Sequence, residues 1–314
     1  MTDDFVTKFE EFYEGGIEQV NFGKAVEVVE QINNFIAEVT RNKINNIVTE
    51  DDFTEDDFNE ISRIVLINAI YFKGRWDEEF SSYETKDACF YMAPGKTKKA
   101  KMMQRLILQR EYSETDEFQF LTLDYLNCDL SMRIILPRKR YGLADVITNL
   151  TINELMKHLT KKEYVEVIVK MPKFEVKTQF DAIETLKGMG IKDLFDTNSN
   201  LEGMSNFKEI LISSILHSAY ICTDEKGTEA AAITVKDLIG YGRCPPHPPP
   251  KEFTADHPFM YLITDSQNNI YFCGVVSGAE FEDGINGSVH QKMEEKISKN
   301  SVISFAKKIF GKRP

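Results

Sequence analysis

Histidine and cysteine are the residues most often used for metal binding and nucleophilic catalysis, and neither is spaced for that chemistry in this chain. The five histidines, at positions 158, 217, 247, 257 and 290, show no metal-ligand spacing. The cysteines contain no CxxC pair, which excludes a zinc knuckle and a thioredoxin-type site; they are Cys89, Cys128, Cys222, Cys244 and Cys273. We therefore predict no metal site. An odd, scattered set of cysteines is typical of reduced thiols and predicts a cytoplasmic protein, with secretion as the alternative if an upstream signal segment is missing from this sequence.

Glycine-rich motifs that bind phosphates are imitated in the sequence but never completed. Met92–Thr97 ends in Gly-Lys-Thr, yet the P-loop pattern needs a glycine at position 90, where the residue is Phe90. Two Gly-x-Gly pairs, which begin at Gly188 and Gly240, lack the third glycine of a dinucleotide fingerprint. Neither GxSxG nor HExxH occurs. We therefore expect no enzyme, no catalytic residue and no cofactor.

A different kind of chemistry is indicated by the segment Asp224–Thr234, which reads DEKGTEAAAIT. It begins with a charged turn and a flexible glycine and continues through small residues without proline. Small residues can enter between two existing strands without steric conflict, and every backbone group then becomes paired. The segment is therefore suited to insertion into a sheet as a new strand. Propensity alone favours the other interpretation, which is the start of an Ala-rich helix.

The charge balance excludes whole classes of partner. The 314 residues carry 38 Lys and Arg against 50 Asp and Glu, so the formal net charge is −12. An acidic surface repels phosphate backbones, and we expect no nucleic-acid partner. The longest apolar run, Ile64–Phe72, is interrupted by Asn68 and is much shorter than the roughly 20 residues of a membrane span. We expect no membrane span.

The elements that must position these residues are helices and strands mixed without a βαβ rhythm. Apolar residues at three- and four-residue steps predict one amphipathic helix over 22–47, and dense β-branched and aromatic residues predict a buried strand over 61–76. Further strands are expected at 118–123, 130–136, 165–171 and 210–223, and shorter helices at 143–150, 152–159 and 180–189. The mixture favours an α+β fold with multi-stranded mixed or antiparallel sheets and surrounding helices.

Two stretches differ from the rest in composition. Cys244–Pro250 holds five of the ten prolines and predicts an extended, irregular surface loop. After Ser277 the chain becomes polar and then basic, with seven Lys or Arg against two Glu from Lys292 onward. We expect a folded domain over 1–277 and a C-terminal extension over 278–314. The basic tail is either a solvated helix or a helix that binds a partner or a membrane surface.

Several long motifs, in order along the chain, resemble those of the serpins, the large family of protease inhibitors. Glu225–Ala232 is similar to the hinge of the reactive-centre loop, Phe253–Phe259 to the strand after that loop, and Asn68–Gly74 to a strand of the central sheet. Three shorter motifs also match, at 171–174, 186–193 and 272–276. The resemblance implies a serpin-like α+β fold with an exposed reactive-centre loop.

The resemblance also implies the site residues and what they do. Trp76 falls at the family's breach position, and Asn68 and His217 fall at its shutter, where His217 matches a buried histidine. The hinge residues are Glu225, Gly227, Thr228, Glu229, Ala230, Ala231 and Ala232. The implied mechanism is suicide inhibition of a serine endopeptidase, extended in some cases to cysteine endopeptidases. A protease cuts the loop, and the cut loop inserts as a new strand of the central sheet and distorts the acyl-enzyme.

The chain departs from the family pattern in its ends and in its loop. The resemblance starts near what looks like the family's helix E, so we expect the N-terminal helices to have no counterpart and the domain to be incomplete at that end. If Thr228 faces inward on insertion, the two-residue period also sends Lys236 inward, where a buried charge opposes insertion. The alternative function is therefore a non-inhibitory relative that acts as a binding or scaffold protein.

The position of the reactive bond stays open between two counts. In the family the bond usually lies sixteen residues after the glutamate that matches Glu225, which gives Tyr241 and makes Tyr241–Gly242 the preferred bond. Counting back from the strand after the loop gives Arg243 or Cys244 instead. The expected partner is a target endopeptidase, chymotrypsin-like if Tyr241 is recognised and trypsin-like if Arg243 is recognised.

Overall fold

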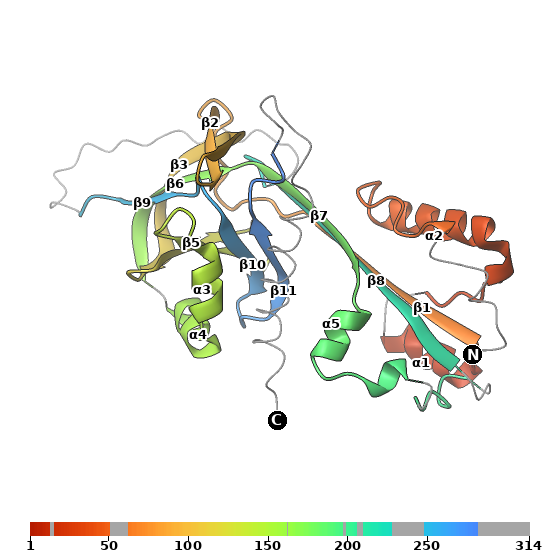
Figure 1. Ribbon diagram of the computed structural model, residues 1–314. Coiled ribbons are helices and arrows are strands. Elements are labelled where there is room, and N and C mark those ends of the chain that lie inside the picture. The colour runs from red at the N-terminus through yellow and green to blue at the C-terminus, as the bar shows by residue number, and fades with distance from the viewer. Residues whose placement is uncertain are drawn as a thin grey trace. The chain divides into compact units, whose positions relative to one another are not determined.

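The computed structural model describes residues 1–12, 16–50, 62–161, 163–196, 199–205, 210–227 and 248–281. The chain divides into two compact units, one of residues 1–72 and 177–221 and the other of residues 73–176 and 222–314. Both units combine helices with β-sheet (Figure 1). The α+β fold predicted from the sequence is confirmed.

The first unit is built on a three-stranded sheet in the order β1–β8–β7. β1 and β8 run parallel and side by side along most of their length (Figure 1). Both contain several β-branched residues, which suit a pleated surface and favour strand formation. The strands are β1 (Ser62–Phe72), β7 (Phe174–Asp181) and β8 (Ile210–Thr223). The helices are α1 (Asp3–Phe12), η1 (Phe22–Lys24), α2 (Ala25–Val39), α5 (Ile183–Gly188) and η4 (Asp193–Phe195).

Two predictions for residues 1–72 of this unit were wrong in extent. The helix expected over 22–47 ends at Val39, because the Thr40 hydroxyl donates to the carbonyl of Ile36 and accepts from the amide of Ile44. Arg41 and Asn42 then take positive φ values and turn the chain. The strand expected over 61–76 ends at Phe72, and it is not uniformly buried, since the Leu66 side chain is 40% exposed.

The second unit is built on an eight-stranded sheet. Seven strands follow the order β11–β10–β5–β4–β3–β6–β9, and β2 pairs with β3 as a hairpin beside that path. The strands are β2 (Lys86–Ala93), β3 (Lys96–Glu114), β4 (Phe118–Asp124), β5 (Leu130–Pro137), β6 (Tyr164–Pro172), β9 (Lys251–Thr254), β10 (Phe259–Asp265) and β11 (Ile270–Val276). Gln109, with a positive φ, lies where the register between β3 and β6 shifts, so one long strand serves two parts of the sheet.

The core of the second unit forms where two short helices cover the sheet. α3 (Leu143–Asn149) and α4 (Ile152–Thr160) bury their apolar faces against β4, β5 and β10. The Thr151 hydroxyl accepts from the amide of Glu154 and caps α4, which fixes where that helix begins. The predicted strands at 118–123, 130–136, 165–171 and 210–223 and both helices are confirmed.

Other expectations can be compared with the fold directly. The helix expected over 180–189 begins only at Ile183, since Phe180 and Asp181 belong to β7. The Gly-Lys-Thr sequence that imitates a P-loop lies at the β2–β3 hairpin, where Gly95 takes a φ of +75°. No helix among the described residues is both long and apolar enough to cross a membrane.

Candidate functional site

The candidate site is a turn of four residues, Asp224–Gly227, which follows directly after β8 and which we call the hinge turn. The Asp224 carboxylate accepts from the amide of Lys226 at 2.9 Å, and the Asp224 carbonyl accepts from the amide of Gly227 at 3.1 Å. Asp at the first position of a turn and glycine at the last is the pattern that favours this conformation. The charged turn expected from the sequence is therefore present.

Gly227 is the one position of the hinge turn where no other residue fits. Its φ is +78°, which is strained for a residue with a side chain. A Cβ atom at this position would also lie 2.3 Å from the amide nitrogen of Trp76 and 2.5 Å from the carbonyl oxygen of Gly74. Both neighbours are backbone atoms that cannot rotate away. The glycine is thus required by close approach as well as by backbone conformation.

Trp76 donates two hydrogen bonds to the hinge turn. Its side chain is 2% exposed, its indole Nε1 donates to the carbonyl of Asp224 at 2.9 Å, and its backbone amide donates to the carbonyl of Lys226 at 3.0 Å. The indole ring stacks on Tyr125, with centroids 4.6 Å apart and planes 9° from parallel. Stacking fixes the orientation of the indole, and the indole in turn fixes the carbonyl of Asp224.

Glu225 ties the hinge turn to the rest of the second unit. Its carboxylate receives the Lys173 ammonium at 2.8 Å and the Thr85 hydroxyl at 2.8 Å, and its carbonyl accepts from the amide of Phe80 at 2.8 Å. Although burial opposes ionisation, the hydrogen bonds from Lys173 and Thr85 hold the pKa of the Glu225 carboxyl below its ordinary value. The carboxylate is therefore ionised at neutral pH and acts as an anchor.

Asn68 and His217 are the two predicted residues of the first unit, and the fold brings them together. They are direct partners in the parallel register of β1 and β8. The His217 ring lies 5.3 Å from the ring of Phe180, and burial lowers the pKa of its imidazole, so the ring is neutral at pH 7. His217 is half-buried rather than buried as predicted, because it lies on the face of β8 opposite Leu216 and Ser218, and Asn68 is exposed.

The remaining predicted residues lie outside the described part of the chain. They are Thr228, Glu229, Ala230, Ala231 and Ala232 of the hinge, and Tyr241, Gly242, Arg243 and Cys244 at the two candidate bonds. Three residues of the site were not singled out from the sequence: Thr85, Tyr125 and Lys173. Lys173 could have been identified, because it lies within the 171–174 motif that matches the family. Thr85 and Tyr125 lie in no motif that the sequence analysis identified.

Two histidine pairs imitate catalytic geometry but are part of the core. Ser113 Oγ lies 2.7 Å from His158 Nδ1, yet both residues are buried and the imidazole packs against the rings of Phe118 and Phe120. His257 is bound on one side by Asp256 and on the other by the carbonyl of Pro137, so both ring nitrogens are occupied.

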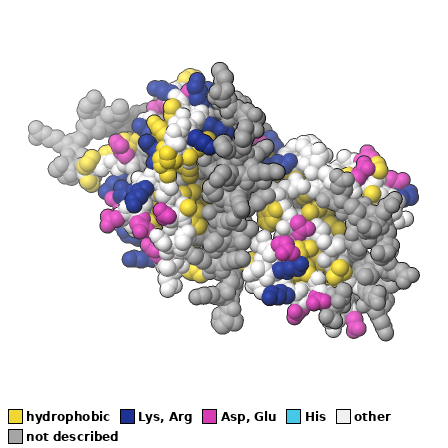
Figure 2. All heavy atoms as spheres, viewed as in Figure 1, with side chains coloured by type: hydrophobic (Ala, Val, Ile, Leu, Met, Phe, Trp, Pro, Cys, Tyr) yellow, Lys and Arg dark blue, Asp and Glu magenta, His cyan; other side chains and the backbone are white. Residues whose placement is uncertain are grey.

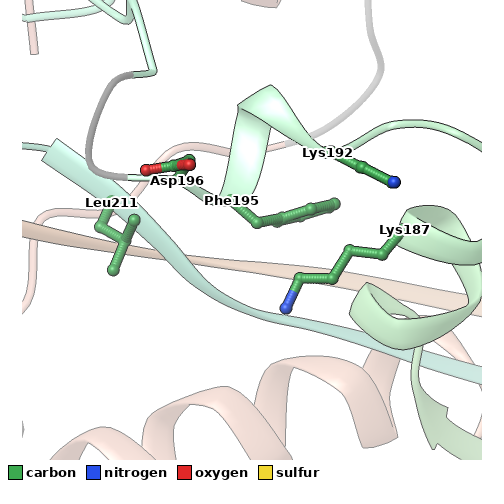
Figure 3. Close-up of a pocket in the computed structure, with 5 residues that line it drawn as sticks. All are labelled: Lys187, Lys192, Phe195, Asp196 and Leu211. Carbon is green, nitrogen blue, oxygen red and sulfur yellow. The ribbon is translucent and has the colours of Figure 1, made fainter.

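A pocket in the first unit also lacks the groups for catalysis. Figure 3 shows the Phe195 ring between the side chain of Lys187 on one side and those of Asp196 and Leu211 on the other; Lys192 completes the lining. None of these side chains is paired as a nucleophile with a base. Among the described residues, no group of three or more His, Cys, Asp or Glu could hold a metal ion.

Comparison with known proteins agrees with the arrangement of these elements. A profile of the family described as "Serpin (serine protease inhibitor)" matches residues 1–278. The chain is 32% identical to human Serpin B3, covering 86% of this chain and 69% of that one, and 34% identical to the bovine leukocyte elastase inhibitor, covering 87% and 73%. Uncleaved ovalbumin has a similar solved structure, with 25% identity, a TM-score of 0.75 and coverage of 88% of this chain and 69% of that chain.

Proposed function

The chain belongs to the serpin family, and from that premise we propose that it is a suicide inhibitor of serine endopeptidases that acts by inserting its cut loop as a new strand. The bovine relative is named as an elastase inhibitor. The inhibitor binds as a substrate, and the protease forms an acyl-enzyme on the loop. Insertion of the cut loop into the sheet then holds and distorts that acyl-enzyme before water can release it.

One observation supports this proposal above the others. β1 and β8 pair directly in parallel register, and the segment that begins with the hinge turn follows β8 without interruption. A strand added beside β8 needs a fixed point from which the chain reverses. The hinge turn supplies that point through the bonds of Trp76, Lys173 and Thr85.

The energy for insertion would come from the small residues that follow the turn. An exposed loop has its backbone hydrogen-bonded to water, and insertion replaces those bonds by a ladder on both sides while it buries alternate side chains. Thr228, Ala230 and Ala232 are small enough to enter without displacing neighbours. Lys236 is the residue where this favourable sequence ends, because a buried ammonium without a partner is costly.

Lys236 therefore favours a second candidate function, a binding or scaffold protein whose loop is cut as a substrate. The two functions differ in one product. Mixed with active chymotrypsin, an inhibitor gives a covalent complex that survives boiling in detergent, whereas a substrate gives two fragments and free enzyme. A stable complex that forms in proportion to the enzyme supports inhibition. Complete cleavage without any complex would overturn it.

The same sample identifies the reactive bond and the class of target. We propose Tyr241–Gly242, because insertion depends on a fixed length between hinge and bond, whereas the far side tolerates added residues such as the proline cluster. The mass of the released C-terminal peptide measures the bond directly. A fragment that begins at Gly242 supports a chymotrypsin-like target, and one that begins at Cys244 replaces it with a trypsin-like target that recognises Arg243.

We also propose that the protein works in the cytoplasm and that residues 278–314 form a C-terminal extension whose first residues still pack on the domain. The exposed thiols of Cys89 and Cys128 support a reducing compartment. At the start of the extension, Phe281 packs against Phe90 with ring centroids 4.9 Å apart, so the first few residues after Ser277 belong to the packed domain. The basic tail beyond lies outside the described residues.

A further inference from the structure

The β2–β3 hairpin is basic in an otherwise acidic chain. Between positions 86 and 101 it carries five lysines and one acid, Asp87, a local charge of +4 in a chain whose formal charge is −12. The lysines are Lys86, Lys96, Lys98, Lys99 and Lys101. Figure 2 shows dark-blue Lys and Arg side chains frequent on the visible face at this end of the second unit.

Most of this charge is open to solvent. Lys86, Lys96, Lys99 and Lys101 are exposed, and Lys98 is half-buried with its ammonium donating to the carbonyl of Phe281 at 3.0 Å. Asp87 binds Lys101 at 2.7 Å. Lys96 and Lys99 form no ion pair with any residue in the described ranges. Within the described ranges, Lys96 and Lys99 are therefore exposed charges that no acidic residue pairs with.

Both ends of the segment 228–247 are tied to the strands that carry these lysines. At the start, Lys173 binds Glu225 through its side chain and donates its backbone amide to the carbonyl of Lys101 at 2.8 Å. At the return, β9 pairs with β6, and just beyond it the carbonyl of Asp256 accepts from the amide of Tyr91 on β2 at 2.8 Å. The hairpin therefore lies beside the described residues at both ends of that segment.

We propose that the β2–β3 hairpin is a second contact surface for the target endopeptidase and that it selects enzymes with an acidic face beside the active-site cleft. This inference rests on the proposed inhibition of an endopeptidase. From Lys86 to Ala93 the hairpin extends about 25 Å at about 3.3 Å per residue. A protein interface of about 800 Å² per partner spans a similar length, so one enzyme can reach both the loop and the lysines.

The expected effect is on the rate of association. Opposite charges on two approaching surfaces raise the association rate constant by about 10- to 1,000-fold at low ionic strength, and salt screens the effect. Reversing Lys96 and Lys99 together changes the charge of the hairpin by four. We expect about a tenfold fall in the rate constant with an acidic enzyme at low salt, and no fall near 1 M salt, where the screening length is about 3 Å.

The experiment compares two forms of one enzyme on two variants of this chain. The enzymes are chymotrypsin and chymotrypsin whose surface lysines are succinylated, both standardised by active-site titration. The test variant is Lys96→Glu/Lys99→Glu, and the control is Lys8→Glu/Lys24→Glu, which makes the same charge change at exposed lysines of the first unit. The control also shows whether net charge alone alters the rate.

The proposal predicts that the association rate constant falls only for the test variant, only with the succinylated enzyme and only at low salt. If the loop is cut without forming a complex, the cleavage rate constant still reports docking, so failure of inhibition is distinguishable from failure of this inference. Equal rates for all three proteins with the succinylated enzyme would overturn it. Retention on immobilised heparin that is lost in the test variant, with protease rates unchanged, would also overturn it in favour of a polysaccharide site.

Discussion

The hinge turn and the middle of the β1–β8 pair are held together in different ways. In the hinge turn, side chains add to the two hydrogen bonds from the backbone amides of Trp76 and Phe80: the indole of Trp76, the ammonium of Lys173 and the hydroxyl of Thr85 each bind a specific atom of residues 224–227. At Asn68 and His217 the strands are held by the parallel backbone ladder, and Asn68 is exposed while His217 is half-buried.

This difference indicates which part is fixed and which part can open. A backbone ladder can be exchanged for another ladder, because an incoming strand offers the same donors and acceptors. Side-chain bonds to particular atoms cannot be exchanged in that way, and breaking them leaves buried groups unsatisfied. We therefore expect the hinge turn to act as a fixed pivot and the ladder at Asn68 and His217 to act as the part that yields.

Removing the indole should have the largest effect on the fixed part. Trp76→Ala deletes a ring that is 2% exposed together with its stacking on Tyr125, and we expect it to lower the free energy of unfolding by about 3–5 kcal/mol. Trp76→Phe keeps an aromatic ring but loses the bond to Asp224, and we expect a smaller loss. Urea denaturation followed by circular dichroism measures both. A loss below 1 kcal/mol for Trp76→Ala would contradict the pivot.

Gly227→Ala should rank second. The new methyl combines a left-handed backbone with overlap against Trp76 and Gly74, and we expect a loss of about 2–4 kcal/mol. Gly95→Ala is the matched control, because its φ of +75° is nearly the same but nothing lies within 4 Å of its Cβ position. The control isolates the backbone strain of about 1 kcal/mol. Equal losses for the two variants would show that close packing at the hinge turn is unimportant.

Acid should loosen the hinge turn through Glu225. Its lowered pKa means that the stabilisation is complete above the ordinary value of 4.5 and is lost as the pH falls through the pKa of the folded state. Glu225→Gln should cost about 1 kcal/mol at pH 7, and its difference from the parent should shrink below pH 4. Trp76 is the only tryptophan, so its fluorescence reports the site during urea titrations at each pH. A difference in unfolding free energy that stays constant with pH would contradict the role of the Glu225 carboxylate as an anchor.

The smallest effect is expected at His217. Because burial lowers the pKa of its imidazole, the stabilisation is complete above the ordinary value of 6.5 and declines as the pH falls below it. His217→Gln should remove this dependence of the opening free energy of β1 and β8 on pH. We expect the free energy itself to change by less than about 1 kcal/mol. Amide hydrogen exchange of residues 62–72 and 210–221 between pH 7.5 and 5.5 separates it from His158, whose pKa is also lowered by burial. Equal pH slopes in parent and variant would exclude His217.

What the sequence predicted and what it missed follow from how local each signal is. β8 was predicted to its exact ends, because a run dense in isoleucine and leucine is a local pattern. β3 and β7 were not predicted, since their charged residues hide the alternation, and β2 was not predicted either. Tyr125 gave no signal, because Trp76, the residue on which it stacks, lies 49 positions away in the sequence. The hinge turn was predictable from Asp224 to Gly227, because turn chemistry is also local.

The most direct test of the account concerns Thr228, the residue that directly follows the hinge turn. Thr228→Arg places an arginine at the first inserted side chain, whereas Glu229→Arg places an arginine one residue later, on the outward face under the two-residue period, and changes the charge by two rather than one. The measurement is the fraction of chymotrypsin trapped in a detergent-resistant complex by each variant at equal loop cleavage. The account predicts that Thr228→Arg is cleaved but traps almost no enzyme while Glu229→Arg traps as the parent does. Trapping by Thr228→Arg at the parent's level would contradict strand insertion.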